Sequence, residues 1–195
     1  MGDIIYVAGG LEKPDSPSAL KTFWSLDLRN LEAGWQELDP WPGLGRMLAV
    51  AGVHEGSFYL FSGAALATGP DHQVVREWLR DAYRYTPGSG WTRLPDLPRV
   101  AVAAPSPAPV LAGRLLILGG DDGTQVKVSP SAHAGFSRQI LAFDPRANHW
   151  QAGGDLPFAL VTTPSVVWHD LLVIPGGESR PGIRSTEVWA LAPKQ

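Results

Sequence analysis

The 195-residue chain contains no cysteine, which excludes disulfides, thiol nucleophiles and cysteine-ligated metal sites. It also lacks an excess of charge of either sign, because 16 lysines and arginines stand against 19 aspartates and glutamates. A formal net charge of −3 indicates neither a nucleic-acid partner nor an anionic membrane surface. The longest apolar region, around residues 100–120, is interrupted by prolines and by Arg114, so no segment is predicted to span a bilayer.

The N-terminus, MGDIIYVAGG, has no basic start and no small-residue cleavage site, and its apolar run is short. These features do not fit a secretory signal peptide. The sequence leaves the location open: the cytoplasm, where the protein is made, or the periplasm if a leader has been removed.

What the chain does have is 22 glycines, 18 prolines and 8 tryptophans, and these residues recur in an internal repeat. Four runs of β-branched and aromatic residues end in small residues: IIYVAGG (4–10), FYLFSGA (58–64), LLILGGD (115–121) and LLVIPGG (171–177). Gly9, Gly63, Gly119 and Gly176 are 54, 56 and 57 residues apart. A period of roughly 50 residues is that of kelch repeats, in which each repeat forms one four-stranded propeller blade.

Each glycine strand is followed by an aromatic strand, at residues 23–28, 82–87, 140–145 and 188–193. Three of these lead to a tryptophan strand that begins near Trp35, Trp91 or Trp150, and an apolar run then leads into the next repeat. The glycines allow turns that need positive φ, and the tryptophans fill the space between neighbouring sheets. The sequence therefore predicts an all-β, kelch-type β-propeller of four four-stranded blades, with no helix beyond a short one within residues 70–80.

The expected blades comprise residues 1–42, 43–98, 99–157 and 158–195. The first blade lacks its apolar first strand and the fourth lacks its tryptophan strand, so both are expected to be incomplete. Exposed strand edges are a liability. We therefore expect either a part of a larger ring or a homo-oligomer that completes the propeller, for example two copies in an eight-bladed ring.

Candidate site residues gather on one predicted face. Strands alternate in direction, so the long connections after the glycine strands, residues 11–21, 65–80 and 121–137, should emerge together. Long loops on a rigid scaffold often carry function. The same face should receive five charged residues, namely Arg46, Arg99, Glu178, Arg180 and Arg184. A carboxylate among arginines suits an anionic small molecule, although Arg46 and Arg99 could instead bridge neighbouring blades.

The remaining polar residues are weaker candidates. Five histidines, His54, His72, His133, His149 and His169, have no metal-ligand spacing. Asp121 and Asp122 resemble a turn cap more than a metal site. Glycines near residue 69 lack the spacing and the Lys-Ser/Thr of a phosphate-binding loop. The sequence thus predicts neither a metal nor a cofactor.

The stretch IPGGESRPGIRSTEVWAL, residues 174–191, resembles the sialic acid mutarotases, also called N-acetylneuraminate epimerases. Gly-Glu, then a basic residue, Pro-Gly, an aliphatic residue and arginine is distinctive of that family, and Gly177 to Arg184 match it in order. Over the rest of the chain the similarity is that of kelch repeats in general. The resemblance implies a propeller of six blades, of which this chain supplies fewer.

By this resemblance, Glu178 is the proton acceptor and Arg184 binds or polarises the sugar acid. Their predicted place on the same face makes Arg46, Arg99 and Arg180 further substrate-binding candidates. The implied activity is interconversion of the anomers of N-acetylneuraminate, an isomerase reaction that requires no metal or cofactor. The active site of a propeller lies at the centre of the ring, so we expect activity if the ring is completed.

Two alternatives belong to other classes. A non-catalytic kelch module that binds a protein or a glycan would leave Glu178 pointing into solvent, whereas an enzyme needs Glu178 and Arg184 to converge. A copper oxidase of the galactose oxidase type shares the kelch fold, but its cross-linked cofactor needs a Cys-Tyr pair, which a chain without cysteine cannot form.

Overall fold

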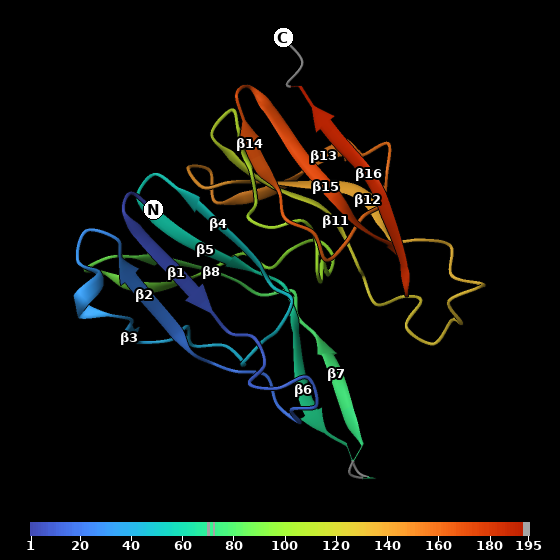
Figure 1. The fold of residues 1–195 in the computed structure, drawn as a ribbon, viewed down its shortest axis with the longest axis horizontal. Helices are drawn as coiled ribbons and strands as arrows, with labels where there is room; N and C mark the ends of the chain where they lie inside the picture. The colour runs from blue at the N-terminus through green and yellow to red at the C-terminus, as the bar shows by residue number, and fades with distance from the viewer. Residues whose placement is uncertain (70, 72, 193–195) are drawn as a thin grey trace.

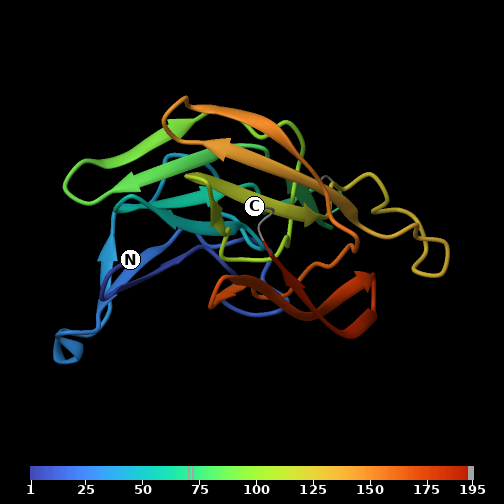
Figure 2. The same cartoon turned by 90° about the horizontal axis from the view of Figure 1, so that it is seen from above.

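The computed structural model of the chain describes residues 1–69, 71 and 73–192. These residues form four antiparallel sheets, one after another along the chain, and a separate two-stranded ribbon. Figure 1 shows the sheets as a fan from the blue N-terminal sheet to the red C-terminal one, and Figure 2 shows the same fan from above. The predicted all-β architecture is confirmed. The described residues include one helical element, the 3₁₀ turn η1 (Leu31–Ala33), and none of their helices is long and apolar enough to cross a membrane.

The first and last sheets have three strands each, as the repeat predicted. Blade one contains β1 (Ile4–Ala8), β2 (Phe23–Asp27) and β3 (Gln36–Leu38). Blade four contains β14 (Val166–Trp168), β15 (Leu171–Arg180) and β16 (Ile183–Leu191). The inner edge of β1 and the outer edge of β16 therefore carry no further strand among the described residues.

The two middle sheets have four strands each. Blade two contains β4 (Val50–His54), β5 (Ser57–Phe61), β8 (Ala82–Thr86) and β9 (Gly90–Leu94). Blade three contains β10 (Val110–Leu111), β11 (Arg114–Gly120), β12 (Ser137–Asp144) and β13 (His149–Asp155). Both follow the order in which the strands occur in the sequence, apart from the ribbon inserted in blade two.

That ribbon is a departure from the sequence-based expectation. The connection 65–80, expected as a long loop with at most a short helix, contains β6 (Ala64–Thr68) and β7 (Val74–Trp78), which pair as an antiparallel hairpin. The β-branched pair Val74 and Val75 favours a strand, and the register places Val75 opposite Ala67. Blade two thus extends a β-hairpin beyond its sheet, visible at the bottom of Figure 1.

Glycine pairs form the same kink in blades one, three and four, and a Ser-Gly pair forms it in blade two. Gly9-Gly10, Gly119-Gly120 and Gly176-Gly177 have φ values of 67° and 107°, 67° and 102°, and 62° and 118°. Blade two has Ser62-Gly63, with φ values of 55° and 102°. Gly63 therefore corresponds to the second glycine of the other pairs, not to the first as the simple spacing suggested. The first position tolerates serine because the hydroxyl of Ser62 donates to the carbonyl oxygen of Leu79 and accepts from the backbone N–H of Ala101.

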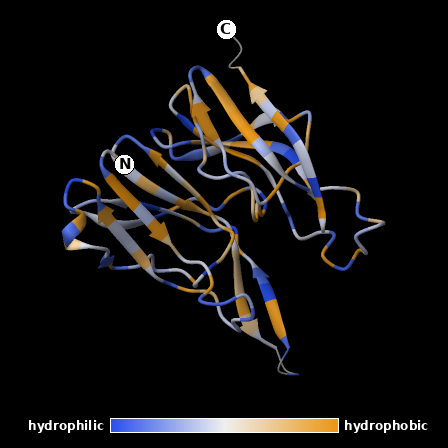
Figure 3. Ribbon diagram, viewed as in Figure 1, coloured by the Kyte–Doolittle hydropathy of each residue, from blue (hydrophilic) through white to orange (hydrophobic). Residues whose placement is uncertain are grey.

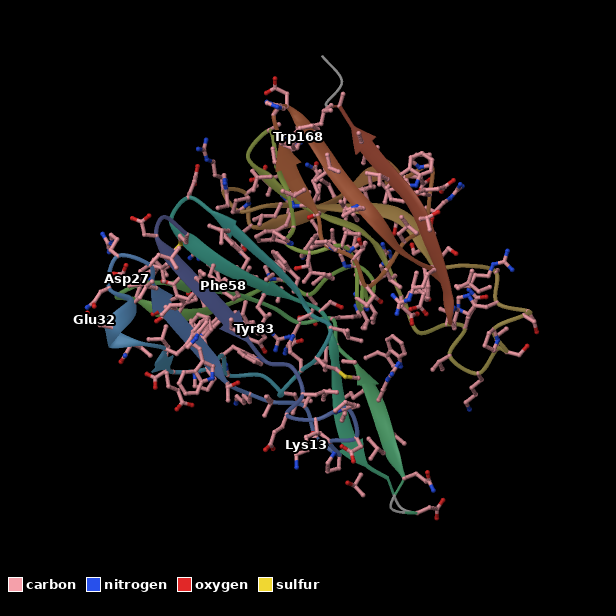
Figure 4. The ribbon with its side chains drawn as sticks, in the orientation of Figure 1. Lys13, Asp27, Glu32, Phe58, Tyr83 and Trp168 are labelled. Atoms are coloured by element: carbon pink, nitrogen blue, oxygen red, sulfur yellow. The ribbon has the colours of Figure 1, made fainter. Side chains whose placement is uncertain are left out.

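The hydrophobic core lies between consecutive blades rather than within one. Because strands alternate their side chains, each sheet presents one face to the preceding blade and one to the following blade. Counting from the glycine kinks, Leu60, Ile117 and Ile174 occupy one equivalent position that faces the preceding blade, and they are 1%, 0% and 0% exposed. Three aromatic or aliphatic clusters fill the three junctions. Figure 4 labels Phe58 and Tyr83, which blade two contributes to the junction with blade one.

The repeated tryptophans join neighbouring blades, as predicted. The indole N–H of Trp91 in blade two donates to the carbonyl oxygen of Asp39 in blade one at 2.8 Å. The indole N–H of Trp150 in blade three donates to the carbonyl oxygen of Pro95 in blade two at 2.9 Å. Each tryptophan therefore combines apolar packing with one specific hydrogen bond to the preceding blade.

Candidate functional site

The connections that follow the glycine strands lie close to one another at one end of the sheets. The ribbon of blade two meets the loop of blade three, because a Cβ on Gly123 would lie 2.8 Å from the ring of Trp78. The same loop reaches blade four, where a Cβ on Gly135 would lie 3.7 Å from the carbonyl oxygen of Ser179. In Figure 1 the ribbon lies at the bottom of the view, and the yellow loop of blade three lies at the right, near the tip of the β15–β16 hairpin.

Glu178 lies in β15, two residues before the end of the strand. Its backbone is held on both sides: the N–H and carbonyl groups of Glu178 and Val161 exchange two hydrogen bonds of 2.9 and 3.0 Å, and Arg184 of β16 is its cross-strand partner. The side chain is only 18% exposed. Glu178 is therefore a fixed, largely covered carboxylate rather than a solvated turn residue.

Arg184 and Glu178 form an ion pair across the hairpin. One guanidinium nitrogen of Arg184 lies 3.3 Å from Oε2 of Glu178, and the Arg184 side chain is 63% exposed. The other carboxylate oxygen, Oε1, accepts a hydrogen bond of 2.8 Å from the backbone N–H of Gly182. Gly182 has a φ of 75°, a conformation that glycine adopts without strain. The Pro-Gly turn thus returns the chain so that Arg184 and the Gly182 N–H both face the same carboxylate.

This arrangement provides a carboxylate with one oxygen fixed by a backbone donor and the other facing an accessible cation. A guanidinium has five N–H donors in a planar fork, so an exposed arginine can engage a second anion. Arg180, at the end of β15, is exposed and pairs with Ile183 in the register of the hairpin. The pair thus has the two groups that binding a small carboxylic acid and moving a proton would require, a guanidinium and a carboxylate.

Arg46 does not project onto this face, contrary to the sequence-based expectation. Its side chain is 0% exposed, and its guanidinium nitrogens lie 2.8 and 2.7 Å from the two carboxylate oxygens of Asp81. It also donates to the carbonyl oxygen of Ser62 and lies over the rings of Trp41 and Tyr83. A side chain so enclosed does not lend its charge to the surface, and the alternative role of blade bridging fits its position.

The partners of Arg46 could not be read from the sequence. Burial raises the pKa of Asp81, but the hydrogen bond and the charge of Arg46 outweigh it, so the pKa of Asp81 lies below its ordinary value. Burial and the hydrogen bond donated to Asp81 raise the pKa of Tyr83 to about 12. Asp81 lies 35 residues from Arg46, and no local pattern links them. One residue in the sequence does fit this contact. Gly43 leaves room for the Asp81 carboxylate, because a Cβ at this position would lie 2.7 Å from it.

Arg99 is half-buried and its guanidinium is engaged within blade three. It donates to the carbonyl oxygens of Val100, Gly119 and Gln139 and to the side chain of Gln139. Burial lowers the pKa of Arg99. Arg99 therefore braces β11 against β12, and the structure does not bring it into contact with Glu178 or Arg184.

The weaker candidates fall in different places. Asp121 and Asp122 accept hydrogen bonds from the backbone two residues further on, as turn caps do. His133 is buried and packs on Phe136, and its Nδ1 accepts the N–H of Gly135. His54 lies 3.8 Å from Glu55, and His72 falls outside the described residues. Within the described part of the chain, no group of three or more metal-ligating side chains could hold an ion.

The fold is that of a kelch-type β-propeller, of which this chain forms a part. A solved structure described as "Structure of YjhT" superimposes with a TM-score of 0.74 and 20% sequence identity. The superposition covers 99% of this chain and 63% of that chain. The four blades therefore correspond to about two thirds of a related propeller.

Curated relatives support the resemblance expected from residues 174–191. No family model matches the chain. Over 88% of this chain, proteins named N-acetylneuraminate epimerase from Yersinia pestis (strain Pestoides F) and Yersinia enterocolitica are 31% and 28% identical. A protein of the same name from Haemophilus influenzae (strain PittEE) is 28% identical over 96% of this chain. The resemblance to this family is confirmed. The chain spans about half the length of the curated relatives it matches, 50% to 54%.

Proposed function

We propose that this chain carries the catalytic residues of an N-acetylneuraminate epimerase, with Glu178 as the base and Arg184 binding the sugar acid, and that it acts when its propeller is completed. The observation that carries the proposal is the Glu178–Arg184 pair, in which a fixed carboxylate faces an exposed guanidinium at 3.3 Å. The names of the similar proteins supply the substrate class. Among the site residues expected from the sequence, no other one within the described part of the chain places an exposed guanidinium group beside a carboxylate.

Arg184 suits the carboxylate of the sugar acid. Substrate binding brings a second carboxylate to the Arg184 guanidinium, and a guanidinium can bind a carboxylate through two parallel hydrogen bonds. The incoming anion competes for the donors that now face Oε2 of Glu178. Because Oε1 stays bonded to the Gly182 N–H, the side chain keeps its position while Oε2 becomes free to accept a proton.

Glu178 then serves the ring opening of the cyclic hemiketal. Its carboxylate takes the proton of the anomeric hydroxyl group, the bond between the anomeric carbon and the ring oxygen breaks, and the ring oxygen receives a proton from a water molecule. The open ketone rotates and closes on its other face, which returns both protons. General-base catalysis by a positioned carboxylate typically contributes about 10²–10⁴-fold.

Arg99 and Arg180 remain predictions as substrate contacts. Arg180 is exposed at the end of the strand that carries Glu178. Arg99 already donates to three carbonyl oxygens. If either binds substrate, its replacement by glutamine weakens sugar-acid binding without changing the rate of exchange at saturation.

The test is two-dimensional exchange NMR on N-acetylneuraminate anomers, with the purified chain alone and with the chain fused to the part of the Yersinia pestis relative that lies outside the matched region and would complete the ring. We expect faster exchange than in buffer, with the greater rate in the completed ring. Saturation-transfer NMR on the same samples reports binding, which Arg184→Ala should weaken. Exchange at the buffer rate in both samples overturns the proposal.

A further inference from the structure

A cavity opens in blade two beside the enclosed Arg46–Asp81 pair. Its volume is about 460 Å³, and it is lined by residues 42–44, 77–81, 83, 93 and 96. These residues belong to the linker from blade one, the end of the ribbon that joins the sheet, β8, and the outer strand β9 with the turn after it. Pockets that bind small molecules typically have volumes of about 300–1,000 Å³. The cavity is therefore large enough for one small ligand, and none of its lining residues comes from the blade that carries Glu178.

Tyr83, labelled in Figure 4, and Asp81 form the polar floor of this cavity. Tyr83 is 2% exposed, and its hydroxyl group donates to Oδ2 of Asp81 at 2.7 Å. Because that proton is committed to Asp81, the Tyr83 oxygen can only accept a hydrogen bond from a ligand. Gly43 leaves room for the floor, since a Cβ there would lie 2.7 Å from Oδ2 of Asp81 and 3.0 Å from a guanidinium nitrogen of Arg46. The floor is thus fixed in place and offers a ligand an acceptor.

Four exposed charged residues also line the cavity. Arg93 and Asp96 form an ion pair of 2.5 Å, and their side chains are 58% and 49% exposed. Glu77 and Arg80 are exposed as well, and Nε of Arg80 donates to the carbonyl oxygen of Leu97 at 2.7 Å. A guanidinium has five N–H donors, and a carboxylate has about four acceptor positions. These contacts occupy only some of them, so the rim of the cavity can both donate to a ligand and accept from it.

The formal charges in and directly behind the cavity balance. Three guanidinium groups stand against three carboxylates, namely Arg46, Arg80 and Arg93 against Glu77, Asp81 and Asp96. Without a net charge, the cavity has no general preference for an anion or a cation. An entirely apolar ligand is disfavoured, because it would take water from the charged groups without replacing their hydrogen bonds. The lining therefore favours a neutral ligand whose polar groups both donate and accept, as hydroxyl groups do.

The linker from blade one adds apolar residues to the cavity. Pro42 and Leu44 line it, and Leu44 is 48% exposed. The carbonyl oxygen of Leu44 accepts the indole N–H of Trp41 at 2.8 Å, which holds the linker in place. Figure 3 shows that β7 changes from hydrophobic colour near the ribbon tip to hydrophilic colour towards the sheet, where Glu77 lies. Apolar and charged residues in one cavity match a pyranose ring, which has an apolar face of C–H groups and a periphery of hydroxyl groups.

We propose that this cavity binds a neutral pyranose sugar. The hydroxyl groups of the sugar donate to Glu77 and to the Tyr83 oxygen and accept from Arg93, and its C–H face packs on Leu44. The site belongs to blade two and is distinct from the Glu178–Arg184 pair of blade four. This inference stands independently of the proposed reaction, because it requires neither a base nor the opening of a sugar ring.

The probes are methyl β-glucopyranoside, methyl β-galactopyranoside and methyl α-mannopyranoside, each tested with the purified chain by saturation-transfer NMR. A methyl glycoside is neutral and its ring stays closed, so its signal reports binding without any anomer exchange. We expect saturation transfer to at least one probe. The same transfer should persist in Arg184→Ala and in the presence of excess N-acetylneuraminate. Transfer to none of the three probes, or its loss in either of these two samples, overturns the proposal.

Variants at the cavity test the individual contacts. Glu77→Ala and Arg93→Ala each remove a charged hydrogen-bonding group, and each should weaken binding of the probe about tenfold. Arg76→Ala is the matched control, because Arg76 is the exposed residue before Glu77 on β7, lies on the other side of the ribbon and is not part of the lining. Unchanged melting temperatures show that the three variants fold. Equal binding by all three variants and the parent, or an equal loss in all three, contradicts the assignment of the cavity.

Discussion

Two arginine–carboxylate pairs of this chain have similarly covered carboxylates, but they differ in the exposure of the arginine and in the number of carboxylate oxygens that it contacts. In blade two, Arg46 is fully enclosed and donates to both oxygens of Asp81. In blade four, Arg184 is 63% exposed and meets one oxygen of Glu178 at 3.3 Å. The enclosed pair has its donors and acceptors occupied by protein groups, so it stabilises the fold. The open pair has hydrogen-bonding capacity left on its exposed guanidinium, so it can bind a ligand.

The largest effect on stability should follow from breaking the enclosed pair. Arg46→Ala leaves the Asp81 carboxylate, whose side chain is only 15% exposed, without its cation, and removing one partner of a buried ion pair typically costs about 3–5 kcal/mol. Urea denaturation measures the free energy of unfolding. A loss of unfolding free energy below about 1 kcal/mol would show that the Arg46–Asp81 pair does not stabilise the fold.

Two tryptophans provide a second comparison, between a side chain packed at a junction of two blades and one that is exposed. Trp150 packs against Phe61 and Phe143 at the junction of blades two and three, whereas Trp35 faces outward. Trp150→Ala should therefore cost about 3 kcal/mol, near the lower end for a packed tryptophan, and Trp35→Ala less than about 1 kcal/mol. Equal losses in thermal or urea unfolding would contradict the difference in packing between these two tryptophans.

The pH dependence of stability should come from the enclosed network. The pKa of Asp81 is lowered in the folded state, so its contribution is present above the unfolded value of about 3.9 and is lost as the pH falls through the folded pKa. The pKa of Tyr83 is raised to about 12, so its contribution is present below about pH 10 and is lost as the pH rises from there towards about 12.

Melting temperatures of the parent and of Tyr83→Phe between pH 8 and pH 12 check the alkaline side. The gap between the two proteins should narrow as the pH rises through this window, because only the parent loses the hydroxyl contribution. A constant gap would mean that the Tyr83–Asp81 hydrogen bond does not set the raised pKa.

The smallest effect on stability belongs to the open pair. Arg184→Ala removes an exposed partner, and exposed ion pairs contribute about 0–1 kcal/mol. Unfolding should therefore change little while sugar-acid binding weakens. If Arg184→Ala destabilises the chain as much as Arg46→Ala does, the two pairs do not differ in role.

The repeat predicted the fold because its signals are local and periodic. The glycine strands, the aromatic strands and Trp91 and Trp150 recur about every 56 residues, and each has the same packing role in each blade. The ribbon β6–β7 escaped prediction because it occurs once, in blade two, and its sequence was interpreted as a loop.

The proximity of two candidate site residues was predictable where they are close in sequence. Glu178 and Arg184 are six residues apart across one turn, and hairpin geometry brings them together. Arg46 was misjudged because its partner Asp81 comes from a distant strand connection, and charge pairing at that separation leaves no periodic signal. An arginine in a sequence gives no indication of whether its charge will be enclosed.

The most direct measurement for the central claim is the rate of N-acetylneuraminate anomer exchange, followed by NMR, for the parent and for Glu178→Gln under identical conditions. Glutamine keeps the size of the side chain and a carbonyl oxygen for the Gly182 N–H, but it removes the base. The parent should accelerate exchange, and Glu178→Gln should return it to the buffer rate while sugar-acid binding persists. Exchange by Glu178→Gln at the rate of the parent would contradict the account.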